Sequence, residues 1–108
     1  MSKTNKEQRE FNRLCKSFII LYGRIINKEE YDLNIRQLCA EWSIDYLEKI
    51  MTNPFFHKLN RIQIAKLWKM CGAIVEDEDV CEQDKIDLWG LQQQLQQILC
   101  KKLDEVVF

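Results

Sequence analysis

Residues 38–51, LCAEWSIDYLEKIM, contain more apolar side chains than one side of a surface helix can hold. Taken with the preceding residues as one helix over 28–51, they form two apolar rows on nearly opposite sides. The first row contains Tyr31, Ile35, Leu38, Cys39, Trp42, Tyr46 and Ile50. The second row contains Leu33, Ala40, Ile44, Leu47 and Met51. A helix that is apolar on two sides must be covered on two sides, so this segment decides how the chain is arranged.

Three arrangements would cover both rows. Other helices of the same chain could pack on both sides, a break at Ser43 could turn both rows toward one core, or the second row could contact another protein. In the third arrangement a two-fold homodimer is the commonest solution. Four helices leave few surfaces for covering one helix completely, which keeps an intermolecular contact open. We assign the first row to the core and name as anchors of that contact Leu33, Ile44, Leu47 and Met51.

The composition indicates one all-α domain over residues 1–108. The chain is long enough to bury a core without disulfides or metal, and 46% of its residues are apolar. Only three glycines and one proline are present, which disfavours a turn-rich β fold. The expected architecture is a four-helix bundle that is mainly antiparallel and up-down. A further short helix would make it a five-helix bundle. The expected helices span residues 5–26, 28–51 and 80–105, with a third helix that begins at residue 54 or 60 and ends at residue 75.

Capping patterns set these boundaries. In a capping box, the side chain of the residue before a helix accepts a hydrogen bond from the backbone N–H of the residue three positions later, and the side chain of that later residue accepts one from the backbone N–H of the first. The pattern occurs at residues 4–7, 27–30, 60–63 and 79–82. Asn53 followed by Pro54 gives one more start, because proline suits the first helical position. The acidic residues 76–79 lack the spacing and the glycine of a calcium loop, so we interpret them as part of the last helix start.

Charge alternates along the four segments, although the formal net charge is −1. The segments 1–28 and 53–75 are basic, and the segments 29–52 and 76–108 are acidic. In an up-down bundle each basic helix would lie between the two acidic ones. The alternation therefore predicts which helices are neighbours, at a small energy per pair.

The basic helices also allow a rival function, which is binding to nucleic acid. The candidate contacts are Arg9, Arg13, Lys16 and Arg24 on the first helix, or Lys58, Arg61, Lys66 and Lys69 on the third. A slight excess of acidic residues in the whole chain argues against this function. Residues 38–51 also fit a helix-turn-helix poorly, because the turn has no glycine and the second helix would present Glu48 to the groove.

No catalytic or metal-binding pattern is present, so we expect neither an enzyme nor a cofactor. The five cysteines form no CxxC pair, and His57 is the only histidine. This usage is typical of free thiols in a reducing cytoplasm rather than of a zinc site or a disulfide framework. An enzyme with a reactive cysteine remains a third and weaker alternative.

The expected function is that of a small cytoplasmic protein that binds other proteins, as an adaptor, small subunit or inhibitor, or that forms a homodimer. The N-terminal residues lack the apolar stretch of a signal peptide, and no apolar run is long enough to span a membrane. Large apolar side chains would carry the binding energy through burial in a fitted pocket. Trp89 is a second anchor candidate, because it shares a flank of the last helix with glutamines that tolerate a packed interface.

Overall fold

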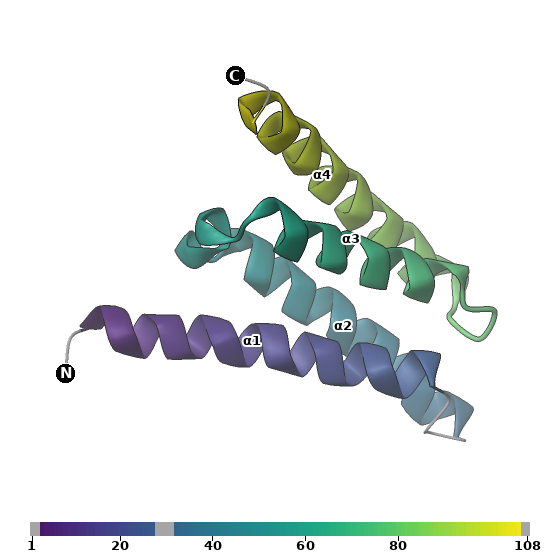
Figure 1. The fold of residues 1–108 in the computed structure, drawn as a ribbon. Coiled ribbons are helices and arrows are strands. Elements are labelled where there is room, and N and C mark those ends of the chain that lie inside the picture. Colours follow the sequence, from purple (N-terminus) through teal and green to yellow (C-terminus); the bar gives the residue numbers. More distant parts are fainter. Residues whose placement is uncertain (1–2, 28–31, 107–108) are drawn as a thin grey trace.

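The computed structural model describes residues 3–27 and 32–106, and the side chains of 5–27 and 32–101. Four α-helices and one 3₁₀ helix follow one another along the chain (Figure 1). They are α1 (Lys3–Ile26), α2 (Leu33–Thr52), η1 (Pro54–Lys58), α3 (Arg61–Glu76) and α4 (Glu82–Val106). No strand occurs in the described residues, which confirms the predicted all-α fold.

The predicted helix starts are confirmed in the middle of the chain and shifted at its other boundaries. The Asn60 side chain accepts a hydrogen bond from the Gln63 amide, and the Gln63 side chain accepts one from the Asn60 amide, both at 2.9 Å. Asn53 caps η1 by accepting from the Phe55 amide at 2.9 Å. These bonds satisfy amides that have no partner inside the helix, and so they set where η1 and α3 begin.

The other three capping patterns do not mark the observed starts. α1 already begins at Lys3, before the pattern at residues 4–7. α2 begins at Leu33 with Asp32 as its cap, whereas the predicted start at residue 28 falls in 28–31, outside the described residues. The first helical hydrogen bond of α4 runs from the Lys85 amide to the Cys81 carbonyl, so Cys81 rather than Asp79 occupies the capping position.

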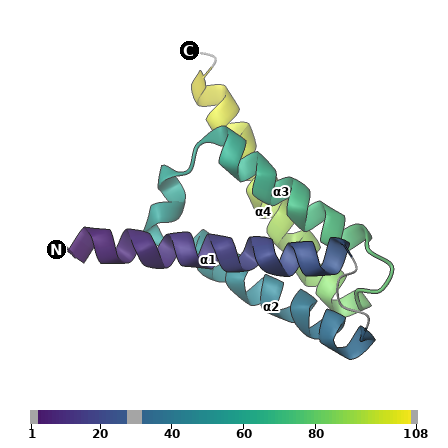
Figure 2. The ribbon, with the colours of Figure 1, turned by 60° about the horizontal axis from the view of Figure 1, so that its bottom comes forward.

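The helices form two layers. α1 packs against α2 as an antiparallel pair and α3 packs against α4, while the two pairs meet through α1 with α3 and α2 with α4. In Figure 1, α2 lies behind α1 and α4 lies behind α3. The molecule measures 45 × 38 × 20 Å, and its smallest dimension equals the thickness of two helices. Figure 2 shows α1 and α3 converging toward their C-terminal ends, so the layers are splayed rather than cylindrical.

This order corrects the predicted charge pattern between neighbours. Within each pair a basic helix contacts an acidic one, as expected. Between the pairs, however, basic α1 lies beside basic α3 and acidic α2 lies beside acidic α4. A surface charge pair contributes only about 0.2–0.5 kcal/mol, whereas a buried leucine or phenylalanine contributes about 1.5–3 kcal/mol. Apolar burial therefore decides how the two pairs meet.

The core lies between the layers and is closed at one end by η1. Where their side chains are described, α1, α3 and α4 each turn one apolar face into this core. Phe18, Leu88 and Leu95 are fully buried, whereas Leu103 and Val106 lie outside the residues whose side chains are described. Phe55 of η1 packs near Phe11 of α1, with ring centres 6.2 Å apart. η1 therefore covers the open end of the α1–α2 pair.

A buried arginine joins three parts of the fold. Arg36 of α2 donates to the Ile25 carbonyl at the end of α1 at 3.0 Å, and it forms ion pairs with Asp77 and Asp79 in the loop between α3 and α4. The Arg36 side chain is only 7% exposed. The acidic residues between α3 and α4 therefore connect the two helix pairs, in addition to preceding α4.

Candidate functional site

The structure divides the five predicted anchor residues between core and surface. Leu47 is fully buried and Ile44 is 8% exposed, so neither side chain is available to a partner in this conformation. Met51 is half-buried and packs against the core. Leu33 and Trp89 are 55% and 56% exposed, which leaves both open to contact. The assignment of Ile44 and Leu47 to a partner surface is therefore corrected.

The buried face of α2 lies between the two predicted rows, not along the first of them. Ile35, Leu38 and Trp42, which we had assigned to the core, are 38%, 41% and 45% exposed. The buried residues of α2 form one continuous face with both apolar rows at its flanks. They are Arg36, Cys39, Ala40, Ser43, Ile44, Leu47 and Ile50. Cys39 and Ile50 come from the first row, whereas Ala40, Ile44 and Leu47 come from the second.

Polar residues at the centre of this face explain the error. Arg36 and Ser43 lie midway between the two apolar rows, where a search for apolar periodicity finds nothing. Ser43 is compatible with burial because its hydroxyl donates to the Cys39 carbonyl at 2.8 Å. Arg36 is compatible because its ion pairs and its bond to Ile25 satisfy part of its hydrogen-bonding capacity. The two rows therefore border one buried face and do not require separate covers.

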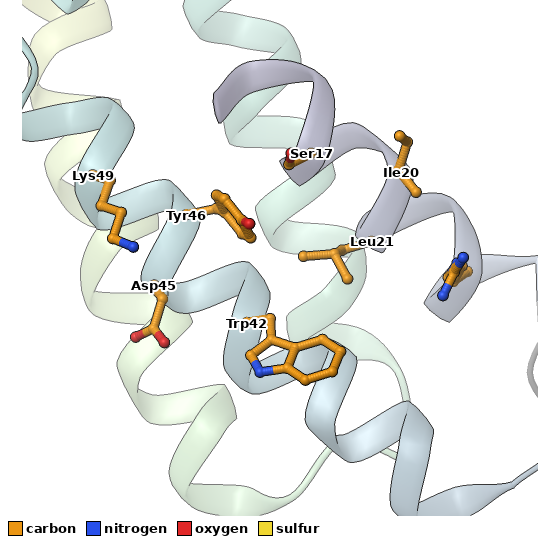
Figure 3. Close-up of a pocket in the computed structure, with 8 residues that line it drawn as sticks. Ser17, Ile20, Leu21, Trp42, Asp45, Tyr46 and Lys49 are labelled. Carbon is orange, nitrogen blue, oxygen red and sulfur yellow. The ribbon is translucent and has the colours of Figure 1, made fainter. Parts of the chain in front are cut away.

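The exposed side of α2 borders a groove against α1, which we call the Trp42 groove (Figure 3). Its volume is about 480 Å³. It is lined by Ser17, Ile20, Leu21 and Arg24 of α1 and by Trp42, Asp45, Tyr46 and Lys49 of α2. Figure 3 shows the Leu21 side chain on the groove floor between the two helices, with Ile20 and Trp42 on either side. Ile35 and Leu38 extend the apolar surface along α2.

Charged groups surround this apolar surface. Arg24, Asp45 and Lys49 lie at its border, and the Lys49 amine lies 5.6 Å from the centre of the Tyr46 ring. Among the described residues, neither Arg24 nor Asp45 forms an ion pair. An apolar centre with tryptophan, tyrosine and arginine, bordered by charge, is the composition of protein-binding surfaces.

The opposite edge of the molecule has two further apolar grooves between α3 and α4. One has a volume of about 400 Å³ and is lined by Val75, Glu82, Lys85, Ile86 and Trp89. The other has a volume of about 550 Å³ and is lined mainly by apolar residues of both helices. Its lining residues are Arg61, Ile62, Ala65, Trp68, Lys69, Gln96, Leu99 and Cys100. Trp89, the second predicted anchor, therefore lies on a surface separate from the Trp42 groove.

The predicted nucleic-acid contacts lie on the surface. The four basic residues named on α1 and the four named on η1 and α3 are all exposed. α1 and α3 belong to the same layer, so both sets lie on helices of one side of the molecule (Figure 1). Lys58 also lies over the Phe55 ring, with its amine 4.6 Å from the ring centre.

No hydrogen bond joins a cysteine to His57 in the described part of the chain. Cys39 and Cys71 are buried, and burial raises the pKa of the Cys71 thiol to about 12. The Cys71 thiol also donates to the Leu88 carbonyl at 3.1 Å. Burial likewise raises the pKa of the Cys15 thiol. A raised pKa leaves little nucleophilic thiolate at neutral pH, so these two residues are poorly suited to covalent catalysis.

Two further properties concern metals and membranes. No group of three histidine, cysteine, aspartate or glutamate side chains within the described residues is placed to hold a metal ion. None of the helices, over their described residues, is both long enough and apolar enough to cross a membrane.

Comparisons with known proteins add no assignment. The chain matches no protein-family model, and neither the curated proteins nor the solved structures contain a significant match.

Proposed function

We propose that this protein acts by binding another protein chain through the Trp42 groove, as a small cytoplasmic adaptor, subunit or inhibitor. The observation that carries this proposal is the exposure of Ile20 and Trp42, at 50% and 45%, along one groove, with Leu38, which is 41% exposed, one helical turn before Trp42. Single exposed apolar residues are common on soluble proteins, but a connected apolar surface is a mark of an interaction site.

The anchors of this interaction are Trp42, Leu38 and Ile20, in place of Ile44 and Leu47. Trp42 offers the largest apolar area, and its indole lies at the mouth of the groove (Figure 3). Tryptophan, tyrosine and arginine carry much of the binding energy in known interfaces, and Tyr46 and Arg24 line the same groove. The protein itself performs no chemistry in this proposal.

The proposal is tested by photo-cross-linking in cells that produce the protein. A photo-reactive phenylalanine analogue replaces Leu38, and irradiation links it to any chain in the groove. We expect a discrete product of higher mass, and we expect Trp42→Glu to abolish it because a charge would then be desolvated on binding. Circular dichroism of the purified Trp42→Glu protein verifies that it is folded. A product whose yield is unchanged by Trp42→Glu would refute the proposal.

Binding to nucleic acid is the second candidate function. It is favoured by the position of α1 and α3 in one layer, which brings the two basic helices together on one side of the molecule. Arg13 and Lys16 of α1, with Lys66 and Lys69 of α3, are exposed and would contact phosphates. The acidic helices α2 and α4 form the other layer and would not oppose such contacts directly.

Retention on duplex DNA and on single-stranded RNA at low salt tests this second candidate. Binding that weakens steeply as the salt concentration rises, and that Lys66→Glu/Lys69→Glu reduces at least about tenfold, would support it. Absence of retention at low salt would exclude it.

A further inference from the structure

We infer that the protein has a second binding surface, a groove between α3 and α4 that takes an acidic amphipathic helix of another protein. It is the groove of about 550 Å³ that Trp68 lines, and we call it the Trp68 groove. It lies on the α3–α4 pair, whereas the Trp42 groove lies on the α1–α2 pair. The inference therefore goes beyond the proposed function and does not depend on it.

The apolar part of the Trp68 groove is open to solvent. Five of its eight lining residues are apolar, and they come from both helices. Ile62 is 64% exposed, which makes it the most exposed large apolar side chain of the described residues. Ala65 follows Ile62 by one helical turn, and its short side chain leaves room for a side chain of a partner. Burial of this surface requires a partner with apolar side chains of its own.

The α3 residues of the groove have the spacing of a second contact face on this helix. The core face of α3 contains residues 64, 67, 71 and 74, whereas the groove contains residues 61, 62, 65, 68 and 69. The groove therefore follows the helix axis for about two turns. Its other wall is also a helix, and no strand edge occurs in the described residues (Figure 1). A helix laid along the groove is the mode of recognition that fits these walls.

The charge of the Trp68 groove has one sign. Arg61 and Lys69 line it, are exposed, and form no ion pair with another described residue. No acidic residue occurs in 53–75, which contains the α3 wall, or in 88–103, which contains the described α4 wall. The next acidic residue of α4, Asp104, comes one turn after Cys100, the last described lining residue. Acidic side chains of a partner would therefore meet cations without opposing anions.

The other two grooves do not share this single sign. The Trp42 groove is lined by Asp45 as well as by cations, and the groove beside Trp89 is lined by both Lys85 and Glu82. A charged partner would be attracted and repelled together at either of them. The Trp68 groove is thus the surface on which charge indicates the chemistry of the partner.

The apolar side chains favour a protein partner over a nucleic acid. Phosphates would also be attracted to Arg61 and Lys69. A phosphate backbone, however, would leave Ile62 and the other apolar lining residues without an apolar partner. An amphipathic helix with acidic flanks buries the apolar side chains and pairs with the cations at the same time.

Two synthetic peptides test the inference, each as long as α3, which has 16 residues. In both, leucines recur every three or four residues and form one row along the helix. The first peptide has glutamate at the positions that flank this row, and the second has lysine there. Because glutamate and lysine have similar helix propensities, the peptides differ mainly in charge. By fluorescence anisotropy, the native protein should bind the glutamate peptide at least about tenfold more tightly than the lysine peptide.

Variants of the protein locate the binding. Lys69→Glu should weaken binding of the glutamate peptide at least about fivefold, whereas Lys66→Glu, the same change on α3 outside the groove lining, should weaken it less than about twofold. Ile62→Ser should also weaken it at least about fivefold. Ile19→Ser is the matched control, because Ile19 is an exposed isoleucine of α1, and it should leave binding unchanged. Arg61→Glu/Lys69→Glu should prefer the lysine peptide.

Several outcomes would overturn the inference. They are no binding of the glutamate peptide at low salt, equal binding of the two peptides, and equal weakening by Lys69→Glu and Lys66→Glu. Duplex DNA that displaces the glutamate peptide and binds Ile62→Ser as tightly as the native protein would assign the cations to phosphate, and would also overturn it. Circular dichroism checks folding. If Lys69→Glu is unfolded, Lys69→Gln and Lys66→Gln provide the same comparison.

Discussion

Replacing Leu47 by alanine should lower the free energy of unfolding by about 2–5 kcal/mol, whereas replacing Leu38 by alanine should change it by less than about 0.5 kcal/mol. Leu47 is fully buried between the helices, and its truncation leaves a cavity that the core can only partly close. Leu38 is 41% exposed on the groove side of α2, where little packing is lost in the single chain.

The two substitutions form a matched pair. Both change leucine to alanine within α2, so the difference in helix propensity is the same and cancels in the comparison. Urea unfolding measures both free energies. Equal losses, or a larger loss at Leu38, would contradict the assignment of Leu47 to the buried face of α2 and of Leu38 to its exposed side.

Replacing Arg36 by methionine should lower the free energy of unfolding by about 3–5 kcal/mol. The substitution keeps an apolar chain of similar length but removes the charge that pairs with Asp77 and Asp79. The Asp77 side chain is only 9% exposed, so its charge would lose a buried partner and regain little water. The Ile25 carbonyl would also lose the hydrogen bond that it accepts from Arg36.

A control variant separates the charge effect from the loss of packing. Adding Asp77→Asn and Asp79→Asn to Arg36→Met removes the uncompensated carboxylates, and we expect it to restore part of the lost stability. Urea unfolding again provides the measurement. A loss below about 1 kcal/mol for Arg36→Met would show that this arginine does not hold the two helix pairs together.

Much of the fold is predictable from local patterns. α1 has one broad apolar face, and Phe11, Phe18 and Ile25 are buried as that face predicts. The reciprocal bonds between Asn60 and Gln63 place the start of α3 as their sequence spacing predicts. In both cases the residues that determine the structure are close together along the chain, so their spacing in the sequence is enough to predict it.

The orientation of α2 is not predictable in this way, because distant residues decide it. Arg36 occupies the inward face only because Asp77, Asp79 and the Ile25 carbonyl are there to receive it. The sequence contains one usable signal, which is the combination of an acidic loop just before α4 and a single arginine near the start of an acidic helix. Without the pairing of α2 with that loop, the apolar rows alone favour the wrong side.

The position of the candidate site follows from the same orientation of α2. Once Arg36 and Ser43 face inward, the helical repeat turns Ile35, Leu38 and Trp42 outward, and Trp42 then lines a groove with Ile20 of α1. The expectation that α2 contacts another chain through an apolar surface is retained as a proposal. The residues proposed for that contact now lie on the other side of the helix.

The central claim is that the Trp42 groove binds another protein chain, and its most direct test compares cross-linking from two adjacent positions of α2. The photo-reactive side chain is placed either at Leu38, beside the groove, or at Gln37, which is exposed on the polar side. One residue turns the side chain by about 100°, so the two positions face different surroundings on the same helix. We predict a discrete product from position 38 and none from position 37. Equal yields from both positions, or a product from position 37 alone, would contradict the claim.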